Sequence, residues 1–257
     1  YIFHLAADTH VDNSLENPIK FFKNNLLGTI NLLTACNELL NKKKIKFIHA
    51  GTDEIYGDLP LKSKSYKNEK SKLIPNNPYS SSKAAGVLAV ETWIRNFNFP
   101  AIICNSVNNF GPYQFVEKFI PRSIFNSINF SKVEVYGKGE NIRSWIYVKD
   151  HVNALIQLSK KGKIGETYSI SGKNSFNNFE LAKKINSILK KKKIICSIKF
   201  VPDRLGHDLK YSLNNIKIRK LGWRPKHNFE KSLKSTIEWY LKKENQNLFK
   251  NINKNIL

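Results

Sequence analysis

The sequence predicts an α/β fold, a doubly wound parallel sheet with a smaller C-terminal lobe. Short apolar runs alternate with longer segments of helical periodicity over roughly the first two thirds of the chain. Because helices separate successive strands, we expect the strands to pair in parallel. Beyond residue 175 the pattern becomes mostly helical, which indicates a second and smaller unit.

Helix-start signals and apolar spacing define the elements of the first half. Pro18 and the pair Asn77-Pro78 are typical of helix N-termini. The segment 62–72 is rich in Lys and Ser and has no apolar face, so we expect a loop there. The predicted elements are a strand at 2–7, a helix at 18–40, a strand at 45–50, a helix at 77–96 and a strand at 101–104.

The second half carries shorter apolar runs and a helical tail. The predicted elements are strands near 134–136 and 145–148, a helix from Asp150, a strand at 166–170, and helices at 179–189, 216–221 and 229–241. We expect residues 1–172 to form the core, with 118–141 contributing to the lobe. Residues 173–257 are then expected to form mainly the lobe.

Composition excludes several classes of protein. Hydrophobic residues at 41% and aromatic residues at 12% are too frequent for a disordered chain. No apolar run approaches about 18 residues and no signal peptide is visible, which predicts a cytoplasmic protein without a membrane partner. Cys36, Cys104 and Cys196 are isolated, so neither a disulfide framework nor a metal site is expected.

The formal charge of +23 raises the possibility of a nucleic-acid partner. Only 6 of the 43 basic residues are Arg, and the chain also holds 31 Asn and 28 Ile. That combination favours compositional drift, because a surface selected for phosphate would favour Arg for its bidentate geometry. The Lys runs 42–44 and 190–193 fall at predicted helix ends, where cations are favourable. We therefore expect no nucleic-acid partner.

Candidate catalytic residues follow the second predicted strand and begin the second long helix. In a parallel sheet, ligands bind outside the carboxyl ends of the strands. Thr52 lies at such an end, and Tyr79 and Lys83 lie four residues apart, on one face of the helix. An adjacent ammonium is expected to lower the pKa of the phenol, so that this pair could deprotonate an alcohol near neutral pH. A second YxxxK match, at Tyr66 and Lys70, lies in the predicted loop and lacks this context.

The adjacent carboxyls Asp53 and Glu54 directly follow Thr52. Such a pair is usually a solvated turn, but its position at the end of a strand favours a functional interpretation. Two carboxyls in different environments can act as one acid and one base. A simple alcohol dehydrogenase needs no such pair, whereas an elimination of water does.

Seven motifs, in the same order, give the chain a clear resemblance to the nucleotide-sugar 4,6-dehydratases of the extended short-chain dehydrogenase/reductase family. The resemblance is greatest to members that act on dTDP-glucose. The motifs are HLAADTHVD at 4–12, TDEIYG at 52–57, PYSSSK at 78–83, NNFGPYQF at 108–115, RSW at 143–145, DRLGHD at 203–208 and LGWRP at 221–225.

The resemblance implies a Rossmann-like core that binds NAD and a redox-neutral elimination. Tyr79, helped by Thr52 and Lys83, would remove the proton of the sugar C4 hydroxyl while hydride passes to the nicotinamide. Glu54 would then abstract the C5 proton, and Asp53 would protonate the departing C6 hydroxyl. Return of the hydride to C6 gives a 4-keto-6-deoxy sugar nucleotide.

The resemblance also assigns binding roles. Implied NAD-binding positions, besides Tyr79 and Lys83, are Leu5, Ala6, Ala7, Asp8, Thr9, Asn24 and Asn109. Positions implied around the nucleotide sugar, besides Thr9 and Thr52, are Asn108, Lys118, Tyr136, Arg143, Asn178, Arg204 and His207. It implies a homodimer formed through the helices at 18–40 and 77–96. Residues 1–172 would bind NAD, and residues 173–257 would mainly bind the substrate.

The chain departs from the family pattern in places. Gly51 stands where Ser is usual and Asn105 replaces Arg, although neither change removes a proposed catalytic group. No Gly-rich turn precedes residues 4–7, and there is no Met anywhere in the chain. We therefore expect the first βαβ part of the fold, with the adenosine half of the NAD site, to be lacking from this sequence.

Three hypotheses on function remain open. The first is a dehydratase. The second is a related epimerase or decarboxylase, and the Asp53-Glu54 pair argues against it. The third is a truncated non-catalytic basic protein. The sequence does not distinguish dTDP-glucose from UDP-glucose.

Overall fold

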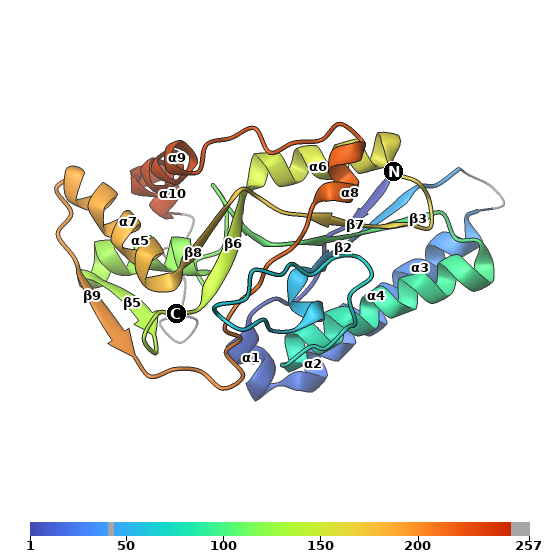
Figure 1. Cartoon of the computed structure of the whole chain (residues 1–257), viewed down its shortest axis with the longest axis horizontal. Helices are drawn as coiled ribbons and strands as arrows, with labels where there is room; N and C mark the ends of the chain where they lie inside the picture. The colour runs from blue at the N-terminus through green and yellow to red at the C-terminus, as the bar shows by residue number, and fades with distance from the viewer. Residues whose placement is uncertain (41–43, 248–257) are drawn as a thin grey trace.

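A parallel four-stranded sheet forms the centre of the larger part of the molecule (Figure 1). The computed structural model describes residues 1–40 and 44–247. The strand order is β1-β2-β3-β7, and all three pairings are parallel. Every residue of the third strand in this order is buried, as expected of a central strand with both faces covered. The strands are β1 (Ile2–His4), β2 (Phe47–Thr52), β3 (Ala101–Ser106) and β7 (Thr167–Ile170).

Helices cover both faces of this sheet, which confirms the doubly wound prediction. One face carries α2 (Pro18–Phe22), the π-helical turn η1 (Lys23–Leu27), α3 (Gly28–Glu38) and α4 (Pro78–Phe97). The other face carries α6 (Val148–Lys161) and α8 (Ile216–Lys220). The helix predicted at 18–40 is therefore interrupted by a π-helical turn and ends at Glu38, whereas the helix predicted at 77–96 is nearly as expected.

A second hydrophobic core lies in the lobe on the left of Figure 1. Its buried side chains include Ile124, Ile185 and Ile237, one from each of three helices. These helices are α5 (Phe119–Phe130), α7 (Asn178–Lys191) and α9 (Phe229–Leu241), followed by α10 (Lys243–Asn247). The chain also returns to the larger part, because Leu213, Ile218 and Trp223 pack in the first core.

Two predicted strands belong to small sheets outside the main one. The strand predicted near 134–136 is β5 (Lys132–Tyr136), which pairs in parallel with β9 (Ser197–Val201). The strand predicted near 145–148 is β6 (Ile142–Tyr147), which lies between β4 (Asn108–Phe110) and β8 (Asn174–Asn177). Apolar runs reveal strands but not their partners, so the sequence could not separate these sheets from the main one.

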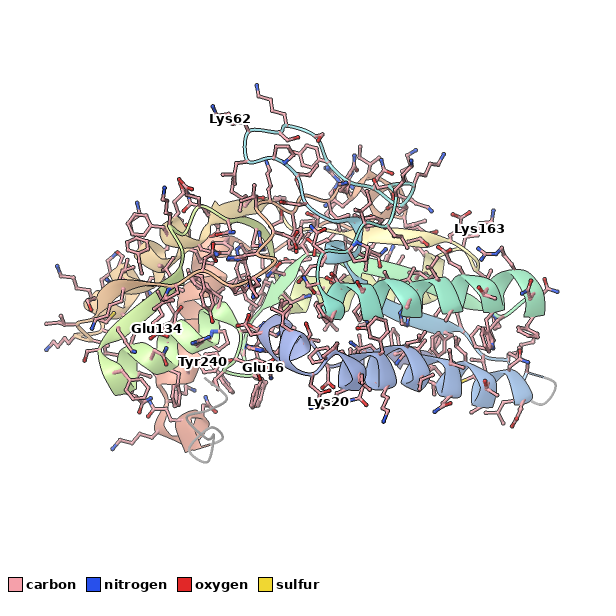
Figure 2. The ribbon with its side chains drawn as sticks, turned by 90° about the horizontal axis from the view of Figure 1, so that it is seen from below. Glu16, Lys20, Lys62, Glu134, Lys163 and Tyr240 are labelled. Carbon is pink, nitrogen blue, oxygen red and sulfur yellow. The ribbon has the colours of Figure 1, made fainter. Side chains whose placement is uncertain are left out.

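The predicted Lys/Ser loop is a long connection between Tyr56 and Pro78, and Figure 2 shows Lys62 at its outer end. Its backbone is tied down where Lys67 N donates to the Ser212 carbonyl at 2.9 Å. Lys190 and Lys191 lie in the last turn of α7, as predicted, whereas Lys42 and Lys43 of the other Lys run lie outside the described residues. Over the described ranges, no helix combines the length and apolarity that crossing a membrane requires.

Candidate functional site

The carboxyl ends of β1, β2 and β3 open into one cleft of about 970 Å³. The strand ends and the loops that follow them supply most of the polar groups that the sequence singles out. From the predicted site, the lining residues are Leu5, Ala7, Thr9, Thr52, Asp53, Glu54, Tyr79, Lys83, Asn108, Asn109 and Lys118. The structure therefore brings all five predicted catalytic residues into a single cavity.

Helix α4 carries Tyr79 and Lys83 in its first two turns. Its start is fixed by a capping box, in which the Asn77 side chain accepts from Ser80 N and the Ser80 hydroxyl bonds back to Asn77 N. Tyr79 N, which has no intrahelical partner at this position, donates to Ser14 Oγ at 3.2 Å. The Lys83 ammonium donates to the Ala50 carbonyl of β2 at 2.7 Å. Tyr79 is therefore held by its backbone and Lys83 by its side chain.

The pKa of Tyr79 is shifted in the direction opposite to the one expected from the neighbouring Lys83. Burial raises the pKa of Tyr79, and the carboxylates of Glu54 and Asp53 raise it further, while the Thr52 hydroxyl acts in the opposite direction. Burial also lowers the pKa of Lys83 to about 8. The prediction that Lys83 lowers the pKa of Tyr79 is thus wrong for this arrangement, because burial dominates over any nearby cation.

Asp53 and Glu54 have unlike surroundings although they are adjacent. Asp53 is 3% exposed, and burial raises its pKa to about 8, with a further contribution from Glu54. Its Oδ2 has no hydrogen-bond partner in the described part of the chain. Burial also raises the pKa of Glu54, but Arg204, Arg143 and Lys118 act against that shift. At neutral pH the geometry therefore favours a protonated Asp53 beside a carboxyl that faces cations.

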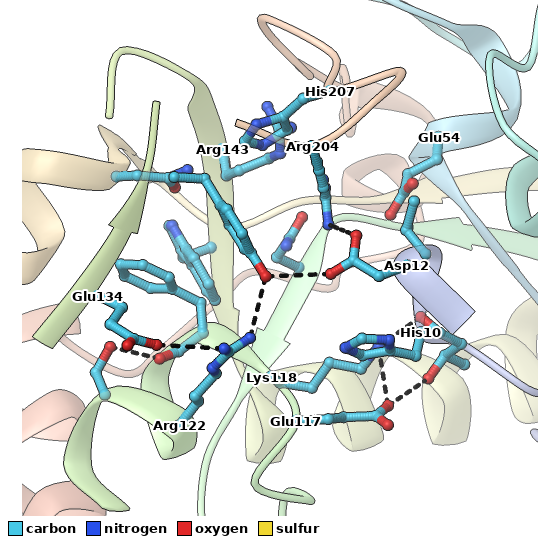
Figure 3. A pocket seen from close by; sticks show the side chains of 18 of the residues that line it. His10, Asp12, Glu54, Glu117, Lys118, Arg122, Glu134, Arg143, Arg204 and His207 are labelled. Carbon is cyan, nitrogen blue, oxygen red and sulfur yellow. Dashed lines mark hydrogen bonds and ion pairs between the residues drawn. The ribbon is translucent and has the colours of Figure 1, made fainter. Parts of the chain in front are cut away.

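A second cleft of about 910 Å³ adjoins the first and extends between the core and the lobe (Figure 3). The two clefts share six lining residues, which are Thr9, Glu54, Asn108, Lys118, Phe119 and Trp145. Its lining includes all the predicted substrate-binding residues except Thr52, which lines the first cleft. Those found here are Thr9, Asn108, Lys118, Tyr136, Arg143, Asn178, Arg204 and His207.

A chain of polar contacts crosses this second cleft. Arg122 donates to Glu134 at 3.3 Å and to the Tyr136 hydroxyl at 3.2 Å. The Tyr136 hydroxyl donates in turn to Asp12 at 3.2 Å, and Asp12 pairs with Arg204 at 3.8 Å. Figure 3 shows this sequence of contacts, which joins helix α1 (Val11–Glu16) of the core to the lobe.

Arg143 and His207 also make hydrogen bonds to neighbouring groups of the protein. The Arg143 guanidinium donates to the Ile142 and Asp208 carbonyls at 2.9 and 2.8 Å and lies 4.3 Å from the centre of the Tyr211 ring. His207 bonds Asp203 at 2.6 Å, although burial lowers the pKa of the imidazole to about 4. Both residues therefore shape the loop that carries Arg204 as well as line the cleft.

Three predicted cofactor-binding residues lie outside the lining of both clefts. Asp8 lines a neighbouring cavity, Asn24 donates to the Asp8 carboxylate at 2.6 Å, and Ala6 is exposed. The next residue in η1, Asn25, holds the Asp8 backbone more firmly. Its Oδ1 accepts from Asp8 N at 2.8 Å, and its Nδ2 donates to the Asp8 carbonyl at 2.9 Å. Asn25 is thus a positioning residue that the sequence analysis missed.

The lining also contains residues that the sequence analysis did not select. Asp12 and Glu117 lie within or beside quoted motifs, and their charge could have singled them out. Arg122 and Asn126 lie four residues apart on α5, a helix that was not predicted. Their roles depend on a helical face and therefore could not be found without that helix.

Comparisons with known proteins place the chain among nucleotide-sugar dehydratases. Residues 1–236 match the family model described as GDP-mannose 4,6 dehydratase. The chain is 41% identical to the dTDP-glucose 4,6-dehydratase of Shigella flexneri, over 95% of this chain and 73% of that protein. It is also 41% identical to the enzyme of the same name from Mycolicibacterium smegmatis, over 93% of this chain and 71% of that protein.

Solved structures agree with this relationship. A dTDP-glucose 4,6-dehydratase of Streptomyces venezuelae, solved with NAD bound, matches with a TM-score of 0.88 and 34% identity over 96% of this chain and 74% of that one. The enzyme of the same name from Bacillus anthracis, in complex with NAD, matches with a TM-score of 0.82 and 36% identity over 95% and 73%. The chain therefore belongs to the family of nucleotide-sugar 4,6-dehydratases.

Proposed function

We propose that the protein converts dTDP-glucose to dTDP-4-keto-6-deoxyglucose and water, a redox-neutral elimination of the kind used in deoxysugar biosynthesis. The observation that carries this proposal is the Asp53-Glu54 pair, with a buried carboxyl and a carboxyl facing three cations in one cleft. An acid and a base in unlike surroundings are what removal of water requires. The names of the related proteins support the choice of substrate.

The residues of the first cleft fit NAD as the cofactor. The buried oxygens Asn109 Oδ1 and Gln114 Oε1 both belong to lining residues and have no hydrogen-bond partner among the described residues. Such orphaned acceptors suit a ligand that carries an amide donor. When bound, NAD supplies the acceptor and later the donor of a hydride, and its positively charged ring favours ionised Tyr79.

The first step assigned to the protein is removal of the C4 hydroxyl proton. Tyr79 would take this proton once its own phenol proton has left, and the Thr52 hydroxyl would hold the substrate oxygen. Lys83 lines the same cleft, and its pKa of about 8 keeps it largely charged at neutral pH.

Elimination would then use the two carboxyls. The C4 ketone acidifies the C5 proton, which Glu54 would take as a carboxylate. Asp53, with its raised pKa, would hold a proton at neutral pH and give it to the departing C6 hydroxyl. As C6 receives the hydride, Glu54 would return a proton to C5. The proton that Tyr79 has taken from the C4 hydroxyl then balances the proton that Asp53 has lost, so only water is released.

The nucleotide diphosphate would occupy the second cleft. Lys118 and Arg204 line it and provide cations for the diphosphate, while Tyr136 and Asn178 lie farther into the lobe. We also propose that residues 1–172 mainly bind NAD, with 118–141 in the lobe, and that 173–257 mainly bind substrate. A cytoplasmic location is proposed because NAD and nucleotide sugars are found there.

Product analysis tests the proposed function. The protein is incubated with NAD and, in separate reactions, dTDP-glucose, UDP-glucose or a uronic acid analogue of these sugars, and products are identified by mass and by NMR. We expect dTDP-glucose to lose one water and to gain a C4 ketone. An epimer with unchanged mass, or loss of carbon dioxide from a uronic acid analogue, would support the related epimerase or decarboxylase instead.

We further propose a homodimer through the helices on the α4 side of the sheet. Ile19 of α2, Leu27 of η1 and Leu88 of α4 are 68%, 49% and 48% exposed. Exposed apolar side chains on adjacent helical segments suit a second copy of the same surface. Sedimentation should show a dimer that Leu27→Glu with Leu88→Glu converts to a monomer. The control Ile156→Glu, on α6 at the opposite face, should leave the dimer intact.

A further inference from the structure

Two histidines without a role in the proposed reaction form a buried pair behind the cleft. His4 is the last residue of β1, and it is in register with His49 of β2. Their Nδ1 atoms are 3.0 Å apart, and the two side chains are 6% and 0% exposed. Neither lines the first or the second cleft. His4 directly precedes residues 5–9, and His49 lies three residues before Thr52 on β2.

The pair faces the helix that carries Lys83. A carbon added at Gly86, one turn after Lys83, would lie 3.8 Å from His49 Nε2, so the imidazole packs against this part of α4. The ammonium of Lys83 donates to the carbonyl of Ala50, the residue after His49. The charge of Lys83 lowers the pKa of both imidazoles, in addition to the effect of burial. The two rings therefore lie within the electrostatic reach of the ammonium.

Both rings of this pair are neutral near pH 7, because burial and the charge of Lys83 lower the pKa of each imidazole. One Nδ1 must donate and the other must accept, so one proton lies between them and neither ring needs to carry a charge. A cationic ring here would repel Lys83 in an environment from which water is excluded. Two neutral rings instead present polarisable, uncharged groups beside the ammonium.

Packing alone does not call for such a pair. Apolar side chains would fill neighbouring buried positions of two parallel strands without the cost of burying imidazole nitrogens. Here His49 Nε2 is buried and has no hydrogen-bond partner among residues 1–40 and 44–247. A polar pair kept at this cost, directly behind Lys83, suggests a function related to that lysine.

We propose that His4 and His49 are positioning residues for Lys83, which keep the ammonium charged and bonded to the Ala50 carbonyl at the floor of the cleft. The pair acts by joining β1 to β2 behind the ammonium and by offering a polar but neutral surface there. Its effect on catalysis rests on the proposed dehydratase function, whereas its effect on Lys83 does not.

The test measures the titration of Lys83 directly. The side-chain ammonium signal is followed by NMR of the ¹⁵N/¹³C-labelled full chain and is assigned by its loss in Lys83→Met. The titratable groups that face Lys83 are His4, His49 and Cys104 from the sheet. In His4→Leu/His49→Leu, we expect the pKa of Lys83 to fall by roughly one unit, because apolar groups stabilise an ammonium less well.

Activity provides a second readout. With dTDP-glucose as substrate, the double variant should lose about tenfold in kcat with KM unchanged, and its high-pH limb should move toward lower pH. His4→Asn, which retains a polar group in place of Nδ1, should recover most of the wild-type titration and remains informative if the double variant does not fold. Val90→Ala, which removes buried methyl groups from α4, controls for lost stability.

Two results would overturn the proposal. One is an unchanged Lys83 titration in the double variant and in His4→Leu. The other is a shift of equal size in Val90→Ala at equal stability. If the wild-type protein forms no product from dTDP-glucose, the proposed function fails, but the NMR titration still decides whether the pair positions Lys83.

Discussion

Asp53 shows how one residue's surroundings determine its chemistry. Its side chain is 3% exposed, and burial together with Glu54 raises its pKa to about 8. The sequence placed the two carboxyls at the end of a strand and predicted that their roles would differ. It could not predict which would be protonated, because that depends on the cations Arg143, Arg204 and Lys118, which come from distant segments.

Asp53→Asn should reduce activity and increase stability. Without the acid, kcat should fall by about 10²- to 10⁴-fold. The pKa of Asp53 is higher in the folded protein than the unfolded value of about 3.9, so the folded state binds more protons between pH ~4 and ~8. Wild-type stability therefore falls as pH rises through that window.

Asn cannot ionise, so the variant avoids this loss of stability. Its excess free energy of unfolding over wild type, measured by urea denaturation, should grow from pH 4 to pH 8. A difference that stays constant across this range would show that Asp53 does not titrate as described.

Gly51 and Asn105, two departures from the family pattern, prove to be spatially coupled. A Cβ on Gly51 would lie 1.9 Å from Asn105 Oδ1, and the Asn105 amide is held by its bond to the Tyr56 hydroxyl at 2.7 Å. Residues 51 and 105 are in register on β2 and β3. A smaller residue at one position therefore accommodates the amide at the other.

Gly51→Ala should lower the free energy of unfolding by about 1–3 kcal/mol, because the added methyl group overpacks this contact. The double variant Gly51→Ala/Asn105→Ala should lose less free energy of unfolding than the two single variants together, by about 0.5–3 kcal/mol. Urea denaturation of the four proteins gives this coupling. Gly28→Ala, where the nearest atom is 3.9 Å away, should not destabilise, and strict additivity at 51 and 105 would contradict the proposed contact.

Among the elements, α4 was predicted well and α5 was missed for physical reasons. Asn77-Pro78 is a strong start signal, and the structure adds the Ser80 half of the capping box. Helix α5 begins after Lys118 without a side-chain cap, and it is rich in Phe and Ile, which have modest helix propensity. Tertiary packing in the lobe core stabilises it, and this packing is not visible in a local pattern.

Asn25 in the π-helical turn η1 is predicted to stabilise the protein by holding the Asp8 backbone. Asn25 makes two hydrogen bonds to the Asp8 backbone and one to Ser82 Oγ at 2.9 Å, and its side chain is 1% exposed. Asn25→Ala leaves partly buried backbone groups of Asp8 and the buried Ser82 hydroxyl without this partner, and it should cost about 1–3 kcal/mol of stability. Thermal or urea unfolding measures this loss.

Asn24→Ala is the matched control, since its contact to the Asp8 carboxylate is exposed to solvent. We expect a change within about 0.5 kcal/mol. Equal losses for Asn24→Ala and Asn25→Ala would contradict the role given to Asn25 in holding residues 8 and 9 at the cleft.

At the scale of the molecule, the functional site is the junction of two cores. The second cleft takes Asp12 and Arg204 from one side and Arg122, Glu134 and Tyr136 from the lobe. The family resemblance predicted Arg204 and Tyr136, whereas Asp12, Arg122 and Glu134 were not predicted. Contacts such as Tyr136 to Asp12 join residues 124 apart, so sequence patterns could not reveal them.

A nucleotide that bridges the two parts should stabilise the whole chain. At a dTDP concentration of about 100 times Kd, the expected gain is about 2.7 kcal/mol. For a protein of this size, that gain raises Tm by roughly 5–10 °C. Calorimetry measures this rise in Tm. Inorganic pyrophosphate is the control and should raise Tm by less than dTDP does. An equal rise in Tm with pyrophosphate would assign the binding to charge alone.

The central claim is that Asp53 and Glu54 eliminate water from a nucleotide sugar, and solvent isotope labelling tests it most directly. The protein is incubated with NAD and dTDP-glucose in deuterium oxide, and the product is examined by NMR and mass spectrometry. We predict a 4-keto-6-deoxy product with deuterium at C5 and with the substrate's C4 hydrogen transferred to C6. A product that retains its C6 hydroxyl would contradict the account.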